Sequence, residues 1–155
     1  MTVVNETSPE WPILRLYELI SGPADRERPW DEIESLFLPG ARIRMGVVSE
    51  AGSVRSVDWS VEEFAREAAE YYRQAGFWER EIARKTDRFG SIAHIFSTYE
   101  SRVGEPESDP VARGINSVQL VRREGCWHIA SIVFQVERPG TPIPDRYLPS
   151  EPGGS

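Results

Sequence analysis

Polar side chains that could take part in chemistry lie within two runs of the sequence, 91–102 and 113–123, that otherwise have the composition of buried β-strands. The first run contains His94, whose imidazole can act as a general acid or base near neutral pH. The second begins with Arg113, whose guanidinium can hold a carboxylate through two hydrogen bonds. A sheet that only packed against a core would not need so many polar groups, so we predict a curved sheet around a small, partly polar cavity. The other polar members are Ser97, Thr98, Tyr99, Glu100, Asn116, Ser117 and Gln119.

Strand geometry divides these polar residues between two faces, because alternate residues of a strand point to opposite sides of the sheet. His94 and Tyr99 therefore cannot both line the cavity. We predict that only one face lines it, and that the opposite face, with Tyr99 and Asn116, serves another packing surface. The predicted cavity-lining residues are His94, Thr98, Arg113 and Ser117.

Two residues are the candidate catalytic groups. His94 is expected to transfer protons, with Glu81 on the neighbouring strand orienting it; the alternative is a hydrogen-bonded histidine of the core or of an interface. Tyr17 lies on the apolar stripe of the first predicted helix, and its hydroxyl could polarise a substrate oxygen. The alternative for Tyr17 is a core residue whose hydroxyl reaches a buried acceptor.

Three further residues are candidate ligand contacts with structural alternatives. Arg113 could bind a carboxylate, or it could pair with Glu100 or Glu137 across the sheet. Asp58 and Trp59 directly precede a predicted helix, where they either contact a ligand or form the entry to the helix.

Metal and cofactor chemistry is not expected. The chain has two His and one Cys, which lie at no ligand spacing, so no transition-metal site is predicted. The sequence contains no glycine-rich phosphate loop, and no cofactor is expected. Cys126 stands beside Trp127 in an apolar strand and is expected to be a buried, inert thiol.

Composition limits the possible partners and location. The 155 residues fit one domain, and the net charge of −7, from 25 acids and 18 bases, opposes binding to nucleic acid. No apolar run approaches the ~20 residues that a membrane span requires. The amino terminus lacks the basic start and apolar centre of a secretory signal, so a cytoplasmic location is expected.

Periodicity predicts a helix-rich first half and a strand-rich second half. Helices are expected at 11–20, 30–37 and 61–75, the last begun by a Ser60/Glu63 capping box and ended by Gly76 as a left-handed cap. Strands are expected at 41–48, 54–58, 77–88, 91–102, 113–123 and 126–137, with a tight turn at Glu124-Gly125. This order predicts a single α+β domain over 8–137, with helices on one face of an antiparallel sheet. The Pro/Gly-rich tail, 138–155, is expected to be extended or disordered.

Several segments resemble the nuclear transport factor 2-like superfamily, and more narrowly its SnoaL-like branch. They are Leu14-Arg-Leu-Tyr-Glu-Leu-Ile20, Phe89-Gly-Ser-Ile-Ala-His-Ile-Phe-Ser-Thr-Tyr-Glu-Ser-Arg102, Arg113-Gly-Ile-Asn-Ser-Val-Gln-Leu120 and Glu124-Gly-Cys-Trp-His-Ile129. The resemblance covers about Glu10 to Glu137. It implies a cone: a strongly bent antiparallel sheet wrapped around three helices, with a pocket at the open end and a homodimer through the outer sheet face.

The same resemblance implies roles for a few residues. Tyr17 matches the position at which members similar to ketosteroid isomerase place an oxyanion donor. Their aspartate base falls where this chain reads Arg44-Met45-Gly46, so that base is missing. Members similar to the polyketide cyclases and scytalone dehydratase use a His with an Asp, for which His94 and Asp58 are the available residues.

The function predicted from the sequence is a small-molecule-binding cone whose ligand, a small apolar or aromatic organic molecule, is unassigned. Its chemistry would be cofactor-free proton transfer, as in a dehydratase, isomerase or cyclase. The alternatives are a non-catalytic homodimeric interaction module and a small structural subunit of a larger enzyme. A homodimer is expected independently of the resemblance, because the last hairpin is apolar on both faces and the helices can cover only one.

Overall fold

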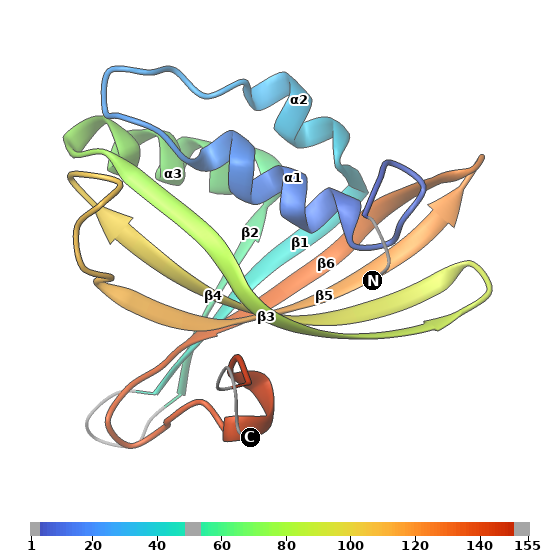
Figure 1. Cartoon of the computed structure of the whole chain (residues 1–155). Helices are drawn as coiled ribbons and strands as arrows, with labels where there is room; N and C mark the ends of the chain where they lie inside the picture. Colours follow the sequence, from blue (N-terminus) through green and yellow to red (C-terminus); the bar gives the residue numbers. More distant parts are fainter. Residues whose placement is uncertain (1–3, 49–53, 151–155) are drawn as a thin grey trace.

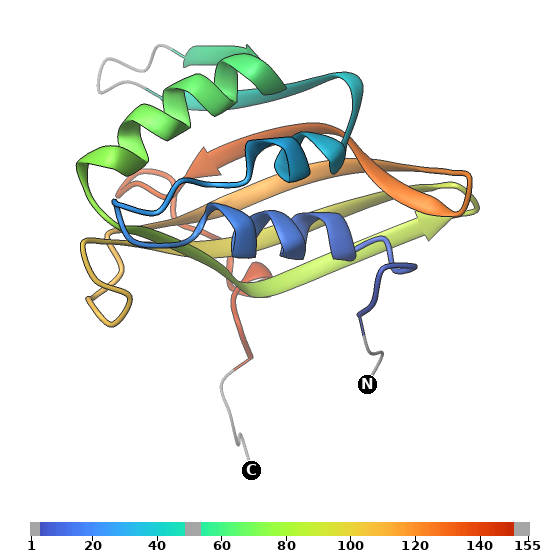
Figure 2. The same ribbon diagram turned by 90° about the horizontal axis from the view of Figure 1, so that it is seen from above.

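The computed structural model describes residues 4–48 and 54–150 and consists of three helices lying on one face of a six-stranded sheet. Figures 1 and 2 show the helices side by side above the bent sheet. The helices are α1 (Trp11–Ile20), α2 (Trp30–Ser35) and α3 (Val61–Gln74), followed near the end of the chain by a 3-10 turn, η1 (Asp145–Tyr147). In the described part of the chain no helix is long and apolar enough to cross a membrane. The predicted α+β class and bent sheet are confirmed.

The sheet has the strand order β2-β1-β6-β5-β4-β3. Its strands are β1 (Phe37–Val48), β2 (Val54–Ser60), β3 (Phe77–Phe89), β4 (Ile92–Val103), β5 (Ala112–Arg123) and β6 (Cys126–Val136). All neighbours are antiparallel except β1 and β6, which pair in parallel. The predicted hairpin of β1 and β2 therefore joins the meander of β3 to β6 in one mixed sheet, which corrects the expectation of a purely antiparallel one.

The segment between α2 and β1 differs from the prediction. The second helix was predicted to reach Phe37 but ends at Ser35, and β1 begins at Phe37 instead of Ala41. Phe37 pairs with Ile129, and the Ile129 N–H donates to the Leu36 carbonyl over 2.8 Å. A hydrogen bond to a strand about ninety residues away thus replaces the last turn that the local apolar pattern favours.

Local signals explain the ends of α1 and α3. Pro12 lies in the first turn of α1, where its missing N–H costs no helical hydrogen bond. Ser60 caps α3, and its Oγ accepts from the Glu63 N–H over 3.1 Å, which is the Ser60 half of the predicted capping box. Gly76 is not the predicted left-handed cap, because α3 ends at Gln74, its C-cap residue Ala75 is extended, and Gly76 has no positive φ. It is instead a site of close approach, since a Cβ there would lie 2.6 Å from the Trp78 ring.

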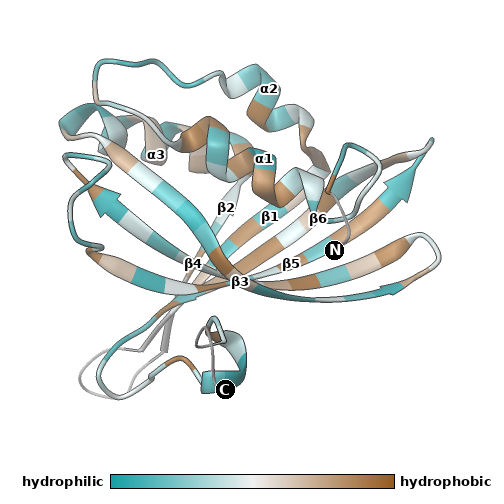
Figure 3. Cartoon of the chain, in the orientation of Figure 1, coloured by the Kyte–Doolittle hydropathy of each residue, from teal (hydrophilic) through white to brown (hydrophobic). Residues whose placement is uncertain are grey.

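The core lies between the helices and the concave face of the sheet. Hydropathy alternates along the central strands (Figure 3), and the inner residues are buried. The Glu124-Gly125 turn has positive φ at both residues, 53° and 82°, which matches the twist of the β5–β6 hairpin. The innermost core residues are Ile13, Ile33, Ile95, Val118, Leu120 and Ile129.

The described part of the tail, 138–150, lies against the sheet face opposite the helices (Figure 1). Ile143 is buried there, and its N–H donates to Glu137 Oε2 over 2.7 Å. The Tyr147 ring packs on Phe96 with centroids 5.1 Å apart, and the Thr98 hydroxyl donates to the Tyr147 carbonyl over 2.6 Å. This segment covers part of the outer face of β3 and β4.

Candidate functional site

A small cavity lies between the helices and the inner face of the sheet, with a volume of about 90 Å³. Its walls are mostly apolar and come from α1, α3 and five strands, β1 and β3 to β6. A carboxyl, an amide and three phenols provide its polar groups. The apolar lining residues are Leu16, Ile20, Ile43, Phe64, Ile132 and Phe134, and the polar ones are Glu79, Asn116, Tyr17, Tyr72 and Tyr99.

Glu79, on β3, is the ionisable acid of this cavity. The residue as a whole keeps some exposed surface, but its carboxyl is desolvated. Burial raises the pKa of Glu79 from 4.5 to about 7, and a hydrogen bond with the Asn116 side chain opposes the shift without cancelling it. Both protonation states of this carboxyl are therefore populated near neutral pH, as a general acid or base requires.

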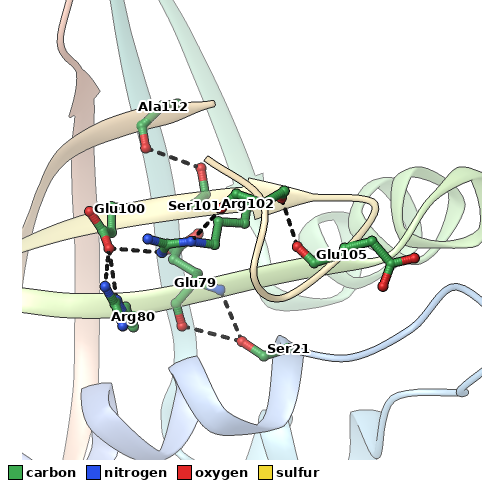
Figure 4. Close-up of polar contacts among 9 residues, drawn as sticks. Ser21, Glu79, Arg80, Glu100, Ser101, Arg102, Glu105 and Ala112 are labelled. Atoms are coloured by element: carbon green, nitrogen blue, oxygen red, sulfur yellow. Dashed lines mark hydrogen bonds and ion pairs between the residues drawn. The ribbon is translucent and has the colours of Figure 1, made fainter. Parts of the chain in front are cut away.

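Ser21, just after α1, fixes the part of β3 that carries Glu79 (Figure 4). The Glu79 N–H donates to Ser21 Oγ over 3.0 Å. The Ser21 hydroxyl in turn lies 2.7 Å from the Tyr17 carbonyl and 3.2 Å from the Glu79 carbonyl. One side chain thus ties the end of α1 to the strand opposite, and sets the position of Glu79 relative to Tyr17.

A chain of hydrogen bonds leads from Asn116 to Glu81. Asn116 Nδ2 lies 2.9 Å from Tyr17 Oη, which lies 2.7 Å from Ser97 Oγ, which lies 2.7 Å from Glu81 Oε2. The amide can only donate at Nδ2, and an ionised carboxylate can only accept. The Tyr17 hydroxyl must then accept from Asn116 and donate to Ser97, which donates to Glu81. Burial raises the pKa of Tyr17 well above its usual value, so this phenol is neutral.

The other two tyrosines are neutral as well. Burial raises the pKa of Tyr72, which stacks on Phe77 with centroids 4.8 Å apart. Burial also raises the pKa of Tyr99. The Tyr99 ring fits only because Gly114 opposes it: a Cβ on Gly114 would lie 2.6 Å from Tyr99 Oη and 2.4 Å from the Gln135 carbonyl oxygen.

The alternation of faces follows the prediction, but the choice of inner face was wrong. Ser97, Tyr99 and Asn116 face the helices and are buried, whereas the four predicted lining residues lie on the outer face. Ser97 and Asn116 are buried at low cost because both bond Tyr17 of α1. The His94 side chain stays exposed, at 56%. The outer four are His94, Thr98, Arg113 and Ser117.

The contacts of these outer residues differ from the predicted ones. His94 Nε2 lies 2.8 Å from Asp87 Oδ2, so Asp87, and not Glu81, is its acidic neighbour. Arg113 Nε lies 2.5 Å from Glu137 Oε1, which is the ion pair considered as its alternative role. Thr98 bonds the tail, as described above.

Asp58 and Trp59 lie on β2, apart from His94. Asp58 is an exposed partner of Arg42, over 2.8 Å, and of Arg44, over 3.5 Å. The hydrogen bond from Arg42 is the largest factor that lowers the pKa of Asp58. Trp59 packs against Phe64, with centroids 6.4 Å apart, and so supports the cavity wall from behind.

Glu79 was not predicted from the sequence, because the alternating charges of its neighbours Arg80, Glu81 and Arg84 are typical of a solvated strand face. The sequence did contain a signal for an inward-facing Glu79, because Phe77, Glu79 and Glu81 are spaced by two and Phe77 is apolar.

The burial of Cys126 was predicted wrongly. It is exposed, because it opens β6 directly after the turn, where the sheet is no longer covered.

No group of three or more His, Cys, Asp or Glu side chains within 4–48 and 54–150 is arranged to hold a metal ion. The polar groups of the cavity offer a carboxylate and an amide oxygen from only two residues, Glu79 and Asn116. The chemistry that these side chains can perform is hydrogen bonding and proton transfer.

No protein-family model matches the sequence, and no curated protein is significantly similar to it. The beta subunit of the benzoate 1,2-dioxygenase of Burkholderia mallei superposes with a TM-score of 0.63 at 8% identity, over 96% of this chain and 100% of that one. A candidate scytalone dehydratase of Novosphingobium aromaticivorans superposes with a TM-score of 0.59 at 11% identity, over 94% of this chain and 92% of that one. A nuclear transport factor 2-like protein of unknown function from Shewanella baltica superposes with a TM-score of 0.53 at 12% identity, over 88% of this chain and 99% of that one. The chain therefore has the cone fold of the nuclear transport factor 2-like proteins.

Proposed function

We propose that the protein binds a small organic molecule inside the cone and exchanges a proton with it through Glu79. The observation that carries this proposal is a carboxyl in an otherwise apolar cavity with its pKa raised to about 7. A structural carboxyl is normally paired with a cation or kept in water, because burial of an unpaired charge is costly. Here the carboxyl is desolvated and its partner is a neutral amide.

The cavity also limits what it can bind. At about 90 Å³ it is smaller than the ~150 Å³ apolar cavity that holds benzene in a well-studied case. It therefore admits the reacting end of a ligand, and a whole ring enters only if side chains such as Phe64 move. Glu79 can remove or return a proton at that end, while the Asn116 amide, which bonds both Glu79 and Tyr17, holds these two groups in place. Dehydration, isomerisation and cyclisation are reactions of this kind and need no cofactor.

In this proposal Glu79 takes the catalytic role that the sequence assigned to His94. A test is proton exchange in heavy water: small ketones are incubated with the protein, and loss of the hydrogens next to the carbonyl is followed by NMR. Glu79→Gln should slow the exchange by roughly 10²–10⁴-fold, the usual contribution of a general base. His94→Ala should leave the rate unchanged.

The opposite pattern, with exchange lost in His94→Ala and retained in Glu79→Gln, would restore the histidine as the base. Equal rates in all three proteins, with no perturbation of cavity residues on adding the ketones, would contradict catalysis and binding in the cone. Circular dichroism of each variant serves as the folding control.

We also propose a homodimer through the outer sheet face. Four large apolar side chains are exposed on this face, and we call them the outer patch: Phe89, Ile92, Phe96 and Val133, at 83%, 61%, 37% and 45% exposure. Exposed apolar groups that gather on one face are typical of interaction sites. The likeness to a dioxygenase beta subunit is compatible with a structural role in a larger assembly, for which a partner chain would have to be found.

A further inference from the structure

The hydrogen-bond chain from Asn116 to Glu81 extends from the cavity to the surface. Its inner end, Asn116, and the next member, Tyr17, line the cavity, and its outer end, Glu81, is bonded by Arg84 Nη1 over 3.0 Å. The side chains of Glu81 and Arg84 are 12% and 30% exposed, so solvent reaches this end. Every oxygen between the two ends belongs to a hydroxyl, which can turn its proton either way.

We infer that Glu81 is a positioning residue for Tyr17: its protonation state decides whether the Tyr17 hydroxyl donates to Ser97 or into the cavity. This inference rests on the proposed function for its use, but the hydrogen-bond geometry that carries it is independent of any ligand.

The two states differ by one proton at Glu81. When Glu81 is ionised it can only accept, so Ser97 donates to it and Tyr17 donates to Ser97, each over 2.7 Å. When Glu81 is protonated its O–H can donate to Ser97, and Ser97 can then donate to Tyr17. The Tyr17 oxygen would accept from Ser97 and Asn116, which uses both its lone pairs and leaves its O–H free for an oxygen in the cavity.

The sequence prediction that Tyr17 polarises a substrate oxygen thus requires the second state. In the first state the hydroxyl proton is already used, and Tyr17 offers the cavity no donor. A protonated Glu81 would therefore provide a Tyr17 donor in the same cavity as Glu79, with the Asn116 amide bonded to both residues.

The surroundings of Glu81 allow both states. Desolvation is the largest effect and raises the pKa of Glu81, and Glu10, just before α1, raises it further. The hydrogen bond from Ser97 and the ion pair with Arg84 lower it. The other ionisable groups facing this region are Glu79 on the same strand, Tyr17 on α1 and Tyr99 on β4. Tyr99 lies directly opposite Glu81 in the β3–β4 register.

The test is a pH titration of the ligand-free protein with ¹³C at the Cζ of its five tyrosines, with Tyr17 identified by Tyr17→Phe. The Tyr17 signal should shift in a step whose midpoint lies above the ordinary glutamate pKa. Glu81→Gln and Ser97→Ala should each abolish this step. Arg84→Gln, which removes the cation but keeps the chain of hydrogen bonds, should move the midpoint to higher pH.

Glu79 is the necessary control, because its own charge also acts on Tyr17. Glu79→Gln should leave the Glu81 step in place. A step that persists in Glu81→Gln and disappears in Glu79→Gln would overturn the inference, and so would an Arg84→Gln midpoint that is unchanged or lower. Since no ligand or turnover is involved, failure here leaves the proposed proton exchange at Glu79 standing, and the reverse also holds.

Discussion

At the scale of single residues, the site depends on two carboxyls of β3 and on whether desolvation or a nearby cation has the larger effect on the pKa of each. Glu79 and Glu81 are two positions apart on β3 and face the same side, yet Glu81 has a cation within 3.0 Å and Glu79 has only neutral partners. Desolvation raises the pKa of both, but at Glu79 only the Asn116 side chain opposes it, whereas at Glu81 both Ser97 and the Arg84 cation do. Glu79 is thus the group poised to exchange a proton near pH 7.

Glu79→Gln should stabilise the protein at alkaline pH. The folded-state pKa of about 7 lies above the usual 4.5, so the folded protein holds this proton more tightly than the unfolded chain does. Wild-type stability should therefore fall, relative to the variant, between about pH 4.5 and pH 7. The free energy of unfolding of Glu79→Gln should exceed that of the wild type by at most about 3 kcal/mol above pH 7, and the difference should vanish near pH 4. Urea unfolding at several pH values measures this difference. A difference that does not vary with pH would contradict the raised pKa.

The sequence revealed part of this site. Tyr17 could be placed on the inner stripe of its helix, and the division of polar residues between two faces followed from strand alternation. Which face was inner could not be read, since it depends on Tyr17 meeting Ser97, eighty residues away. Glu79 could have been found by continuing the spacing of two from Phe77, but the neighbouring arginines made the segment resemble a solvated face.

At the scale of elements, the inner surface requires close contacts between strands. Gly114 on β5 is the clearest example, because backbone and side-chain atoms occupy the space that a Cβ would take. Most element bounds were predicted within a few residues from periodicity and capping. The start of β1 and its parallel pairing with β6 were not, because both depend on a contact with Ile129 that local sequence does not encode.

Gly114→Ala should destabilise the fold and disturb the cavity. The new Cβ would lie 2.4 Å from a backbone oxygen of β6, and either the strands separate or Tyr99 moves. Overpacking of this kind costs about 1–3 kcal/mol, to be measured by urea unfolding. Gly46→Ala is the matched control, since its Cβ would meet only the flexible Gln135 side chain, at 3.1 Å. Equal free energies of unfolding for the two variants would show that β5 and β6 can separate at Gly114 without loss of stability, which would contradict this prediction.

At the scale of the whole molecule, the two faces of the sheet have separate tasks. The inner face forms the core and the cavity with the helices, and the outer face is only partly covered, by the segment 138–150. Phe96 and Val133 flank Ser117 across three adjacent strands, so the outer patch extends beyond the tail. One copy of the chain leaves these side chains in water, and a second copy would cover them.

Val133→Lys should therefore convert a dimer to a monomer without unfolding it. Val133 lies on the middle of the outer face at 45% exposure, and a lysine there would place a charge at the centre of the interface. Val111→Lys is the matched control, because Val111 is 62% exposed and lies in the loop before β5. Sedimentation equilibrium should give twice the 17.6 kDa chain mass for the wild type and Val111→Lys, and the single mass for Val133→Lys. A monomeric wild type, or a Val133→Lys variant that stays dimeric, would contradict a homodimer through the outer patch. The contact of Phe96 with Tyr147 would then be the packing interaction left to this patch.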